Sequence, residues 1–156
     1  MTQTEKAAFA AGCFWGIEHR FRQIDGVIEA TSGYMNGKTQ NPSYKDVCSG
    51  TTGHAEAVQV IYDPAIITYD ELLSHFWDMH DPTQKNRQGP DVGTQYRSGL
   101  YVYNDTQEKL AKESLQKIQS RYSTPIATEI KKADTFWEAE EYHQRYIEKN
   151  GGICHL

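Results

Sequence analysis

The chain contains 156 residues, of which 38% are hydrophobic and 24% are charged, as is usual for one globular domain. Its mean hydropathy of -0.72 and the lack of a long apolar run exclude a transmembrane helix. The net charge of -5, without a basic stripe, argues against nucleic-acid binding. Because the number of cysteines is three, a closed set of disulfides is excluded. At least one thiol must therefore be spare, metal-bound or chemically active.

The N-terminus, Met1 to Lys6, lacks the basic and apolar regions of a secretory signal. We therefore expect a cytoplasmic protein, in which thiols are kept reduced and disulfides tend to be transient. Nothing in the sequence indicates an obligate dimer, so we expect a monomer. We also expect a single domain over residues 1–156, with a mobile tail at residues 150–156.

The first half of the chain alternates strand and helix patterns. A short apolar run predicts a strand over residues 7–11, which Gly12 ends. Apolar residues at helical spacing, from Phe14 to Ile24, then predict an amphipathic helix. A second strand is predicted over residues 27–34, followed by a long polar loop over residues 35–53.

The second half begins with a strand of period two over residues 55–62. Thr68 and Glu71 form a capping-box pattern that opens a helix ending near Met79. The later elements are predicted as a polar loop over residues 81–95, a strand over 96–103, a helix carrying Ala111, Leu115, Ile118 and Tyr122, a strand over 127–131 and a helix over 136–148. This order predicts an α/β (α+β) fold, a ferredoxin-like split βαβ two-layer sandwich with an additional C-terminal helix and tail.

Cys13 is the sharpest chemical feature. It follows a strand and a glycine, at the first turn of the first predicted helix. The positive end of a helix favours a thiolate, so we expect a lowered pKa and a nucleophilic sulfur at Cys13. The alternative is a small buried side chain, since free cysteines are often interior. Of the two aromatic residues that follow, Phe14 fits the core-facing stripe of the helix, whereas Trp15 lies off it and is the better candidate for a pocket wall.

Glu56 interrupts an apolar face. It has the same parity as Val58 and Val60 in its predicted strand. A carboxyl group in apolar surroundings has a raised pKa and can serve as a proton donor. The alternative is that the strand is still solvated at its first residues, where Glu56 lies.

Tyr44 and Tyr96 lie in or beside the two long loops, where a phenol can donate a hydrogen bond to a developing oxyanion. Cys154 lies near the C-terminus after two glycines, so it could approach an oxidised partner and form a disulfide; an incidental exposed thiol is the alternative. For Cys48, in the first loop, we favour a structural role, with disulfide exchange as the second possibility.

Two competing site chemistries find weak support. The three cysteines and six histidines could bind a metal, but the sequence contains no C-x-x-C or H-x-x-x-H spacing. A cysteine-hydrolase dyad could pair Cys13 with His54 or His80 as the base, although no local signature of such an enzyme is present.

Several sequence blocks are similar to one known family. They are Gly12-Cys13-Phe14-Trp15-Gly16, Ser32-Gly33-Tyr34, Asn41-Pro42-Ser43-Tyr44, Cys48-Ser49-Gly50, Thr52-Gly53-His54-Ala55-Glu56, His80-Asp81-Pro82, Gly93-Thr94-Gln95-Tyr96-Arg97-Ser98, Phe136-Trp137-Glu138-Ala139-Glu140 and Tyr142-His143-Gln144. These blocks span nearly the whole chain, which resembles the peptide methionine sulfoxide reductase A family.

The resemblance implies reduction of methionine S-sulfoxide, free or in proteins, to methionine, and hence repair of oxidised proteins. It implies that Cys13 is the nucleophile, Glu56 the acid, and Tyr44 and Tyr96 the hydroxyls around the sulfoxide oxygen, with Asp91 supporting them. Phe14 and Trp15 would then form the pocket for the substrate methyl group.

The family's recycling implies that Cys154 resolves the sulfenic acid on Cys13 and that thioredoxin reduces the resulting disulfide. No metal, flavin or nicotinamide cofactor is expected, and neither is a nucleic-acid or membrane partner. Some family members have a longer, glycine-rich C-terminus with a further cysteine, whereas this chain stops two residues after Cys154. A one-step relay from Cys13 to Cys154 is therefore expected.

Two other functions remain as rivals. A cysteine hydrolase or acyltransferase would form an acyl-enzyme and would not need a second cysteine. A non-catalytic module that binds proteins containing oxidised methionine would release no methionine from a sulfoxide substrate.

Overall fold

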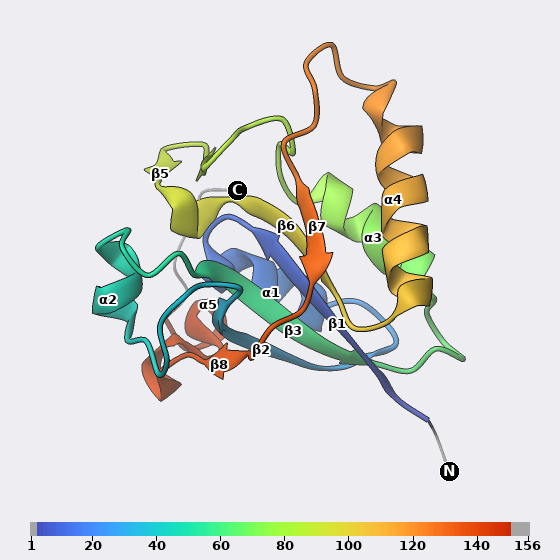
Figure 1. Ribbon diagram of the computed structural model, residues 1–156. Helices are drawn as coiled ribbons and strands as arrows, with labels where there is room; N and C mark the ends of the chain where they lie inside the picture. The colour runs from blue at the N-terminus through green and yellow to red at the C-terminus, as the bar shows by residue number, and fades with distance from the viewer. Residues whose placement is uncertain (1–2, 151–156) are drawn as a thin grey trace.

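The computed structural model describes residues 3–150, and a six-stranded sheet lies at their centre (Figure 1). Its strand order is β7-β6-β1-β3-β2-β8. Each neighbouring pair among the four inner strands is antiparallel, and their order is that of the predicted split βαβ sandwich. The strands are β1 (Glu5–Ala11), β2 (Val27–Met35), β3 (Ala55–Tyr62), β6 (Ser98–Val102), β7 (Glu129–Lys132) and β8 (Trp137–Glu138).

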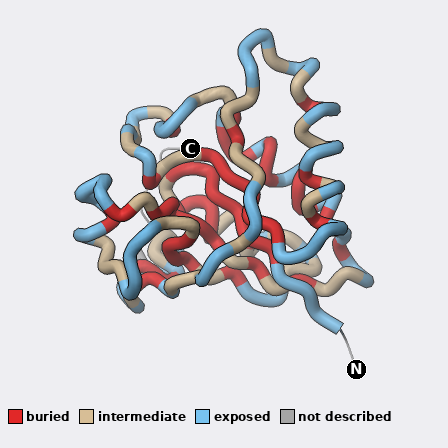
Figure 2. The backbone as a smooth tube through the Cα atoms, viewed as in Figure 1, coloured by how far each residue is buried: buried red, intermediate tan, exposed pale blue. Residues whose placement is uncertain are grey.

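Three helices share one hydrophobic core with one face of the sheet. They are α1 (Phe14–Arg22), α3 (Tyr69–Asp78) and α4 (Asp105–Gln119). Phe21 and Phe76 of the first two helices pack around Phe9 of β1, with ring centroids 4.7 and 5.6 Å from it. In Figure 2 the buried residues gather in the strands and in the helix faces turned toward them. The predicted capping box of α3 is present, with the Thr68 side chain accepting a hydrogen bond from Glu71 N.

The other face of the sheet carries mostly small side chains. Ala8, Ala10 and Ala57 are buried there, with Phe136 packed against the same cluster. Gly33 allows Phe136 to pack close to the sheet, because a Cβ atom at position 33 would lie 2.3 Å from the Phe136 ring. In the part of the chain that the structure describes, no helix is both long and apolar enough to span a bilayer.

Both predicted loops contain short elements. The first holds α2 (Tyr44–Cys48), which begins with a capping box formed by Ser43 and Asp46. The second holds the hairpin of β4 (Arg87–Gln88) and β5 (Asp91–Val92), followed by the 3-10 helix η1 (Thr94–Tyr96). The strand predicted to begin at Tyr96 therefore begins at Ser98, because the η1 turn comes first.

The helix predicted over residues 136–148 is wrong. That stretch instead forms β8, the 3-10 helix η2 (Glu141–His143) and the short helix α5 (Tyr146–Asn150). The Gln144 side chain bonds both backbone groups of Ser32, and the buried carboxylate of Glu18 accepts the backbone N–H of Arg145. Arg145 has a φ of 55°, which ends any helix there. These tertiary contacts override the local helical pattern. The predicted tail lies, apart from Asn150, outside the described residues.

Candidate active site

Cys13 lies at the junction between β1 and α1. Gly12 ends the strand with a φ of +100°, and Cys13 is the N-cap residue of the helix. The thiol is partly exposed, so the alternative of a fully buried side chain is wrong. It therefore occupies the positive end of α1, where the partial charges of the backbone N–H groups favour a thiolate.

Glu56 lies in β3 beside this junction. Its side chain is almost fully buried, at 1% exposure, which rules out the alternative of a solvated carboxylate. Glu56 Oε1 accepts a hydrogen bond from Phe14 N at 3.2 Å. The β2–β3 register pairs Glu56 with Tyr34, whose side chain is also buried. The buried carboxyl group is thus bound to the residue that follows the nucleophile.

Tyr44 and Tyr96 approach the same carboxyl group from the two loops. Tyr44 is the first residue of α2 and Tyr96 the last of η1. Burial raises the pKa of both phenols, and the nearby Glu56 charge raises them further. Asp91, in β5, and Cys13 add to the rise in the pKa of Tyr96. Both hydroxyls therefore keep their protons at neutral pH and can donate hydrogen bonds.

An aromatic cluster lines one side of the site. Phe14 is buried, with its ring centroid 5.6 Å from that of Tyr34 and 6.3 Å from that of Tyr44. Trp15 is only partly buried, as its position off the core stripe predicts. The Trp15 ring stacks on Tyr146 of α5 at 3.8 Å, with an interplanar angle of 9°. This cluster forms an apolar surface beside the thiol.

His143 and Tyr146 are site residues that the sequence reasoning missed, although the block containing His143 carries the family resemblance. Trp15 Nε1 donates a hydrogen bond to His143 Nδ1 at 2.9 Å. Burial lowers the pKa of His143, although the charge of Glu140 opposes this shift. The ring is therefore neutral at pH 7, and because Nδ1 accepts a hydrogen bond, its proton is on Nε2.

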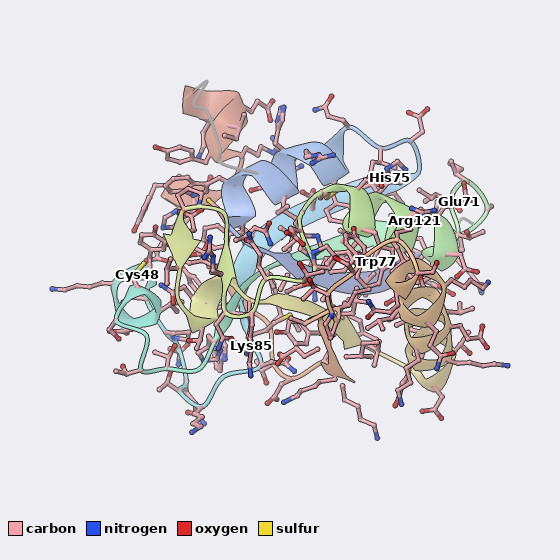
Figure 3. All side chains as sticks on the ribbon, turned by 90° about the horizontal axis from the view of Figure 1, so that it is seen from above. Cys48, Glu71, His75, Trp77, Lys85 and Arg121 are labelled. Atoms are coloured by element: carbon pink, nitrogen blue, oxygen red, sulfur yellow. The ribbon has the colours of Figure 1, made fainter. Side chains whose placement is uncertain are left out.

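Cys48 ends α2, near the hydroxyl of Tyr44. In Figure 3 it lies at the end of the molecule that also holds the β4–β5 hairpin, whereas Trp77 and Arg121 lie at the other end. Desolvation raises the pKa of the Cys48 thiol, and its hydrogen bond with Tyr44 opposes the rise. A raised pKa reduces the thiolate fraction of this exposed cysteine, and the structural role expected for it stays a prediction. Cys154 lies outside the described residues.

The two histidines of the hydrolase alternative are occupied elsewhere. His54 Nδ1 accepts from Gly37 N, and its Nε2 contacts the carbonyl of Thr39 at 2.7 Å. His80 contacts Phe76 O through Nδ1 and Ser98 Oγ through Nε2. Because both nitrogens of each ring already have partners, neither histidine is placed to act as a base for Cys13. Within residues 3–150, no group of three or more His, Cys, Asp or Glu side chains could hold a metal ion.

The family model described as peptide methionine sulfoxide reductase matches residues 5–156. The chain belongs to this family. A peptide methionine sulfoxide reductase MsrA of Geobacter sulfurreducens is 56% identical over 153 residues, which cover 97% of this chain and 94% of the relative. This degree of coverage shows that the whole chain, rather than a fragment of it, has the family's pattern.

Solved structures of the reductase family agree with the fold. The reduced form of Mxr1 from Saccharomyces cerevisiae is 41% identical, with a TM-score of 0.94, and the match covers 98% of this chain and 90% of that one. A second structure contains Mxr1 in complex with Trx2; it is 31% identical, with a TM-score of 0.68 and coverage of 92% and 85%. The predicted fold class is thus confirmed.

Proposed function

We propose that the protein reduces methionine S-sulfoxide, free or within proteins, to methionine, and so repairs oxidised proteins. Membership of the reductase family supports the reaction class. The observation that carries the proposal is the placement of a partly exposed thiol at a helix N-terminus, one residue from a backbone N–H that is bound by the buried carboxyl of Glu56. The nucleophile and the acid can then reach the sulfur and the oxygen of one sulfoxide group.

The first step is an attack on sulfur. A sulfoxide sulfur is a poor electrophile until its oxygen is protonated or strongly hydrogen-bonded. In our proposal the burial of Glu56 favours its neutral form, which donates the proton, while the hydroxyls of Tyr44 and Tyr96 bind the same oxygen. The Cys13 thiolate forms a bond to the substrate sulfur. The sulfur–oxygen bond and this new bond then break as the protonated oxygen moves to Cys13 Sγ. Two electrons reach the substrate, methionine leaves, and Cys13 becomes a sulfenic acid.

Apolar side chains are proposed to select the substrate methyl group. Phe14 and Trp15 form the wall that would bind it, and the neutral His143 and the stacked Tyr146 hold the Trp15 ring in place. We assign Asp91 to the polar side of the site, near the Tyr96 hydroxyl. A thioether methyl and a sulfoxide oxygen would then point to chemically different walls, which is the basis for selecting one epimer.

The second step regenerates a thiol. We propose that the Cys154 thiolate attacks the sulfenic sulfur of Cys13. The sulfur–oxygen bond breaks, the oxygen takes up a proton and leaves as water, and a Cys13–Cys154 disulfide forms. Tyr146 of α5 stacks on Trp15, so the chain passes close to the site shortly before this cysteine. The four Cα–Cα steps from Asn150 to Cys154 can span at most about 14 Å. The complex of the yeast relative with Trx2 supports thioredoxin as the reductant that completes the cycle.

We place this cycle in the cytoplasm, where thioredoxin-type systems keep thiols reduced. The whole chain is proposed to act as one catalytic domain and as a monomer, because Cys13, Glu56, Tyr44 and Tyr96 all come from one chain. Gel filtration of the active protein tests the monomer.

The decisive experiment is an assay on the separated S and R epimers of a methionine sulfoxide peptide, with thioredoxin, its reductase and NADPH. We expect methionine from the S epimer only and no turnover by Cys13→Ser, because a serine hydroxyl cannot accept the oxygen in this way. A preference for the R epimer, or activity of Cys13→Ser, would contradict the proposal. Mass spectrometry after one turnover without reductant should find the Cys13–Cys154 bridge; a Cys13–Cys48 bridge or a lasting sulfenic acid would refute the relay.

A further inference from the structure

Glu140 lies between the sheet and α2. Its Oε1 accepts a hydrogen bond from the Tyr34 hydroxyl at 2.9 Å, and its Oε2 accepts one from the backbone N–H of Tyr44 at 3.0 Å. One carboxylate therefore joins a fully buried residue of β2 to the first residue of α2, across sequence separations of 106 and 96 residues.

We infer that Glu140 is a positioning residue, which holds the Tyr44 hydroxyl in place for the reaction by tying the start of α2 to the sheet. The inference rests on the proposed function, since it concerns the geometry around the sulfoxide oxygen. Glu140 itself contacts the backbone of Tyr44 and not the reacting atoms.

Tyr34 is a suitable fixed point for this link. Its side chain is 0% exposed, and the β2–β3 register places it directly opposite Glu56. A residue that is linked to Tyr34 is therefore also fixed relative to β2 and β3, and β3 contains the proposed acid Glu56. Through Glu140, the Tyr44 backbone acquires a defined position relative to Glu56, although the two tyrosines belong to different elements.

Tyr44 needs an external tie because α2 cannot hold itself. The helix contains only five residues, and a helix that short is marginal without tertiary contacts. The ring of Tyr44 has neighbours, with centroid distances of 4.3 Å to His143 and 6.4 Å to Trp15. Such ring contacts restrict the plane of the phenol, whereas the bond from Tyr44 N to Glu140 fixes the point from which the side chain extends.

The charge of Glu140 strengthens both bonds. Partial burial favours the neutral form. Hydrogen bonds from Tyr44 N, from the backbone of Glu140 itself and from the Tyr34 hydroxyl, together with His143, outweigh it and hold the pKa of the Glu140 carboxyl below its ordinary value. An ionised carboxylate can accept on both oxygens, and hydrogen bonds to a charged acceptor are stronger than neutral ones.

The test is a double-mutant cycle on single-turnover methionine formation at saturating methionine S-sulfoxide. We expect Glu140→Ala to lower this rate by about tenfold or more, because displacement of a reacting group by about 1 Å can cost up to about a hundredfold. In a Tyr44→Phe background the same substitution should cost less than about twofold, since the hydroxyl that it positions is already absent.

Two further variants separate positioning from general stability. Glu140→Gln should keep the rate within about threefold, because the amide oxygen can accept from Tyr44 N while its NH₂ donates to the Tyr34 oxygen. Tyr34→Phe removes the sheet end of the link and should lower the rate in the same direction as Glu140→Ala. Glu138→Ala, an exposed glutamate two residues away, is the matched control and should leave the rate unchanged.

Two results would overturn the inference: a full rate in Glu140→Ala, or an equal loss from this substitution in the wild-type and Tyr44→Phe backgrounds. If Glu140→Ala does not fold, Tyr34→Phe with and without Tyr44→Phe decides by the same comparison. An inactive wild-type protein would instead refute the proposed function, so the two failures are distinguishable.

Discussion

The backbone N–H of Phe14 is bound by the side chain of Glu56, although the two residues are 42 positions apart in the chain. This bond connects the first turn of α1 to the first residues of β3. It places the carboxyl group one residue from Cys13. The proposed acid thus has a fixed reference in the same helix end that activates the nucleophile.

Glu56 is predicted to act by donating a hydrogen bond or proton. Glu56→Gln should retain part of the single-turnover rate, because an amide still donates a hydrogen bond, whereas Glu56→Ala should lose on the order of a hundredfold or more. The measurement is methionine formed per enzyme in one turnover without reductant. Full activity of the alanine variant would remove Glu56 from the acid role.

The two remaining cysteines should behave differently. Cys154→Ser should abolish turnover driven by thioredoxin but keep single-turnover reduction at Cys13, because only the regeneration step needs the second thiol. Cys48→Ser is the matched control and should keep turnover with thioredoxin, since its thiol has a raised pKa. Equal recycling by the wild type and Cys154→Ser would show that another thiol or thioredoxin itself resolves the sulfenic acid.

Gly12 and Gly50 both have a positive φ, and Gly12 should tolerate a side chain less well than Gly50. Gly12→Ala would place a Cβ atom 2.9 Å from Gln88 Cβ at a φ of +100°. Gly50 also has a positive φ, of +78°, but a Cβ atom there meets nothing within 4 Å. In urea unfolding, Gly50→Ala should cost roughly 1 kcal/mol from backbone strain alone, and Gly12→Ala roughly 2 to 3 kcal/mol. Equal losses would show that Gln88 yields without cost.

His80 should make the protein less stable in acid. Burial lowers the pKa of His80 from 6.5 to about 4. Between these values the unfolded chain binds a proton that the folded chain does not, so folding is favoured above pH 6.5 and the contribution is lost as the pH falls towards 4. The loss in the free energy of unfolding should reach up to about 3 kcal/mol.

Urea unfolding at pH 7 and pH 4.5 measures this effect. His80→Asn should reduce the pH dependence, whereas His75→Gln, an exposed position in the helix α3 that ends just before His80, should keep it. An unchanged pH dependence in His80→Asn would show that another group accounts for the acid sensitivity.

The inner strands and the long helices could be predicted because their periodicity comes from burial of one face. Phe14, Ile17 and Phe21 recur at helical spacing and are all buried in the core. The segment over residues 136–148 could not be predicted in this way. Its conformation depends on Gln144 and on the carboxylate of Glu18, whose partners lie more than 100 positions away in the sequence.

The same distinction applies to the site. Glu56 could be recognised because it interrupts the apolar parity of its own strand, and the structure confirms that it is buried. His143 and Glu140 show no such local signal, since their relation to Trp15 and Tyr44 arises only when the C-terminal segment packs beside α1 and α2. The local sequence pattern therefore identifies a residue that interrupts the hydrophobic pattern of its own strand or helix. It does not identify a residue whose role is a contact with a different strand or helix.

The antiparallel pairing of β1 with β3 also has a consequence for folding. Cys13 follows β1 and Glu56 is in β3, so the two proposed reacting groups are apart until these central strands associate. A chain emerging from synthesis, or one recovering from denaturant, carries the thiol without its proton donor. The rate at which reductase activity returns during refolding would thus report when β1 and β3 pair. This step depends on contacts between residues distant in sequence.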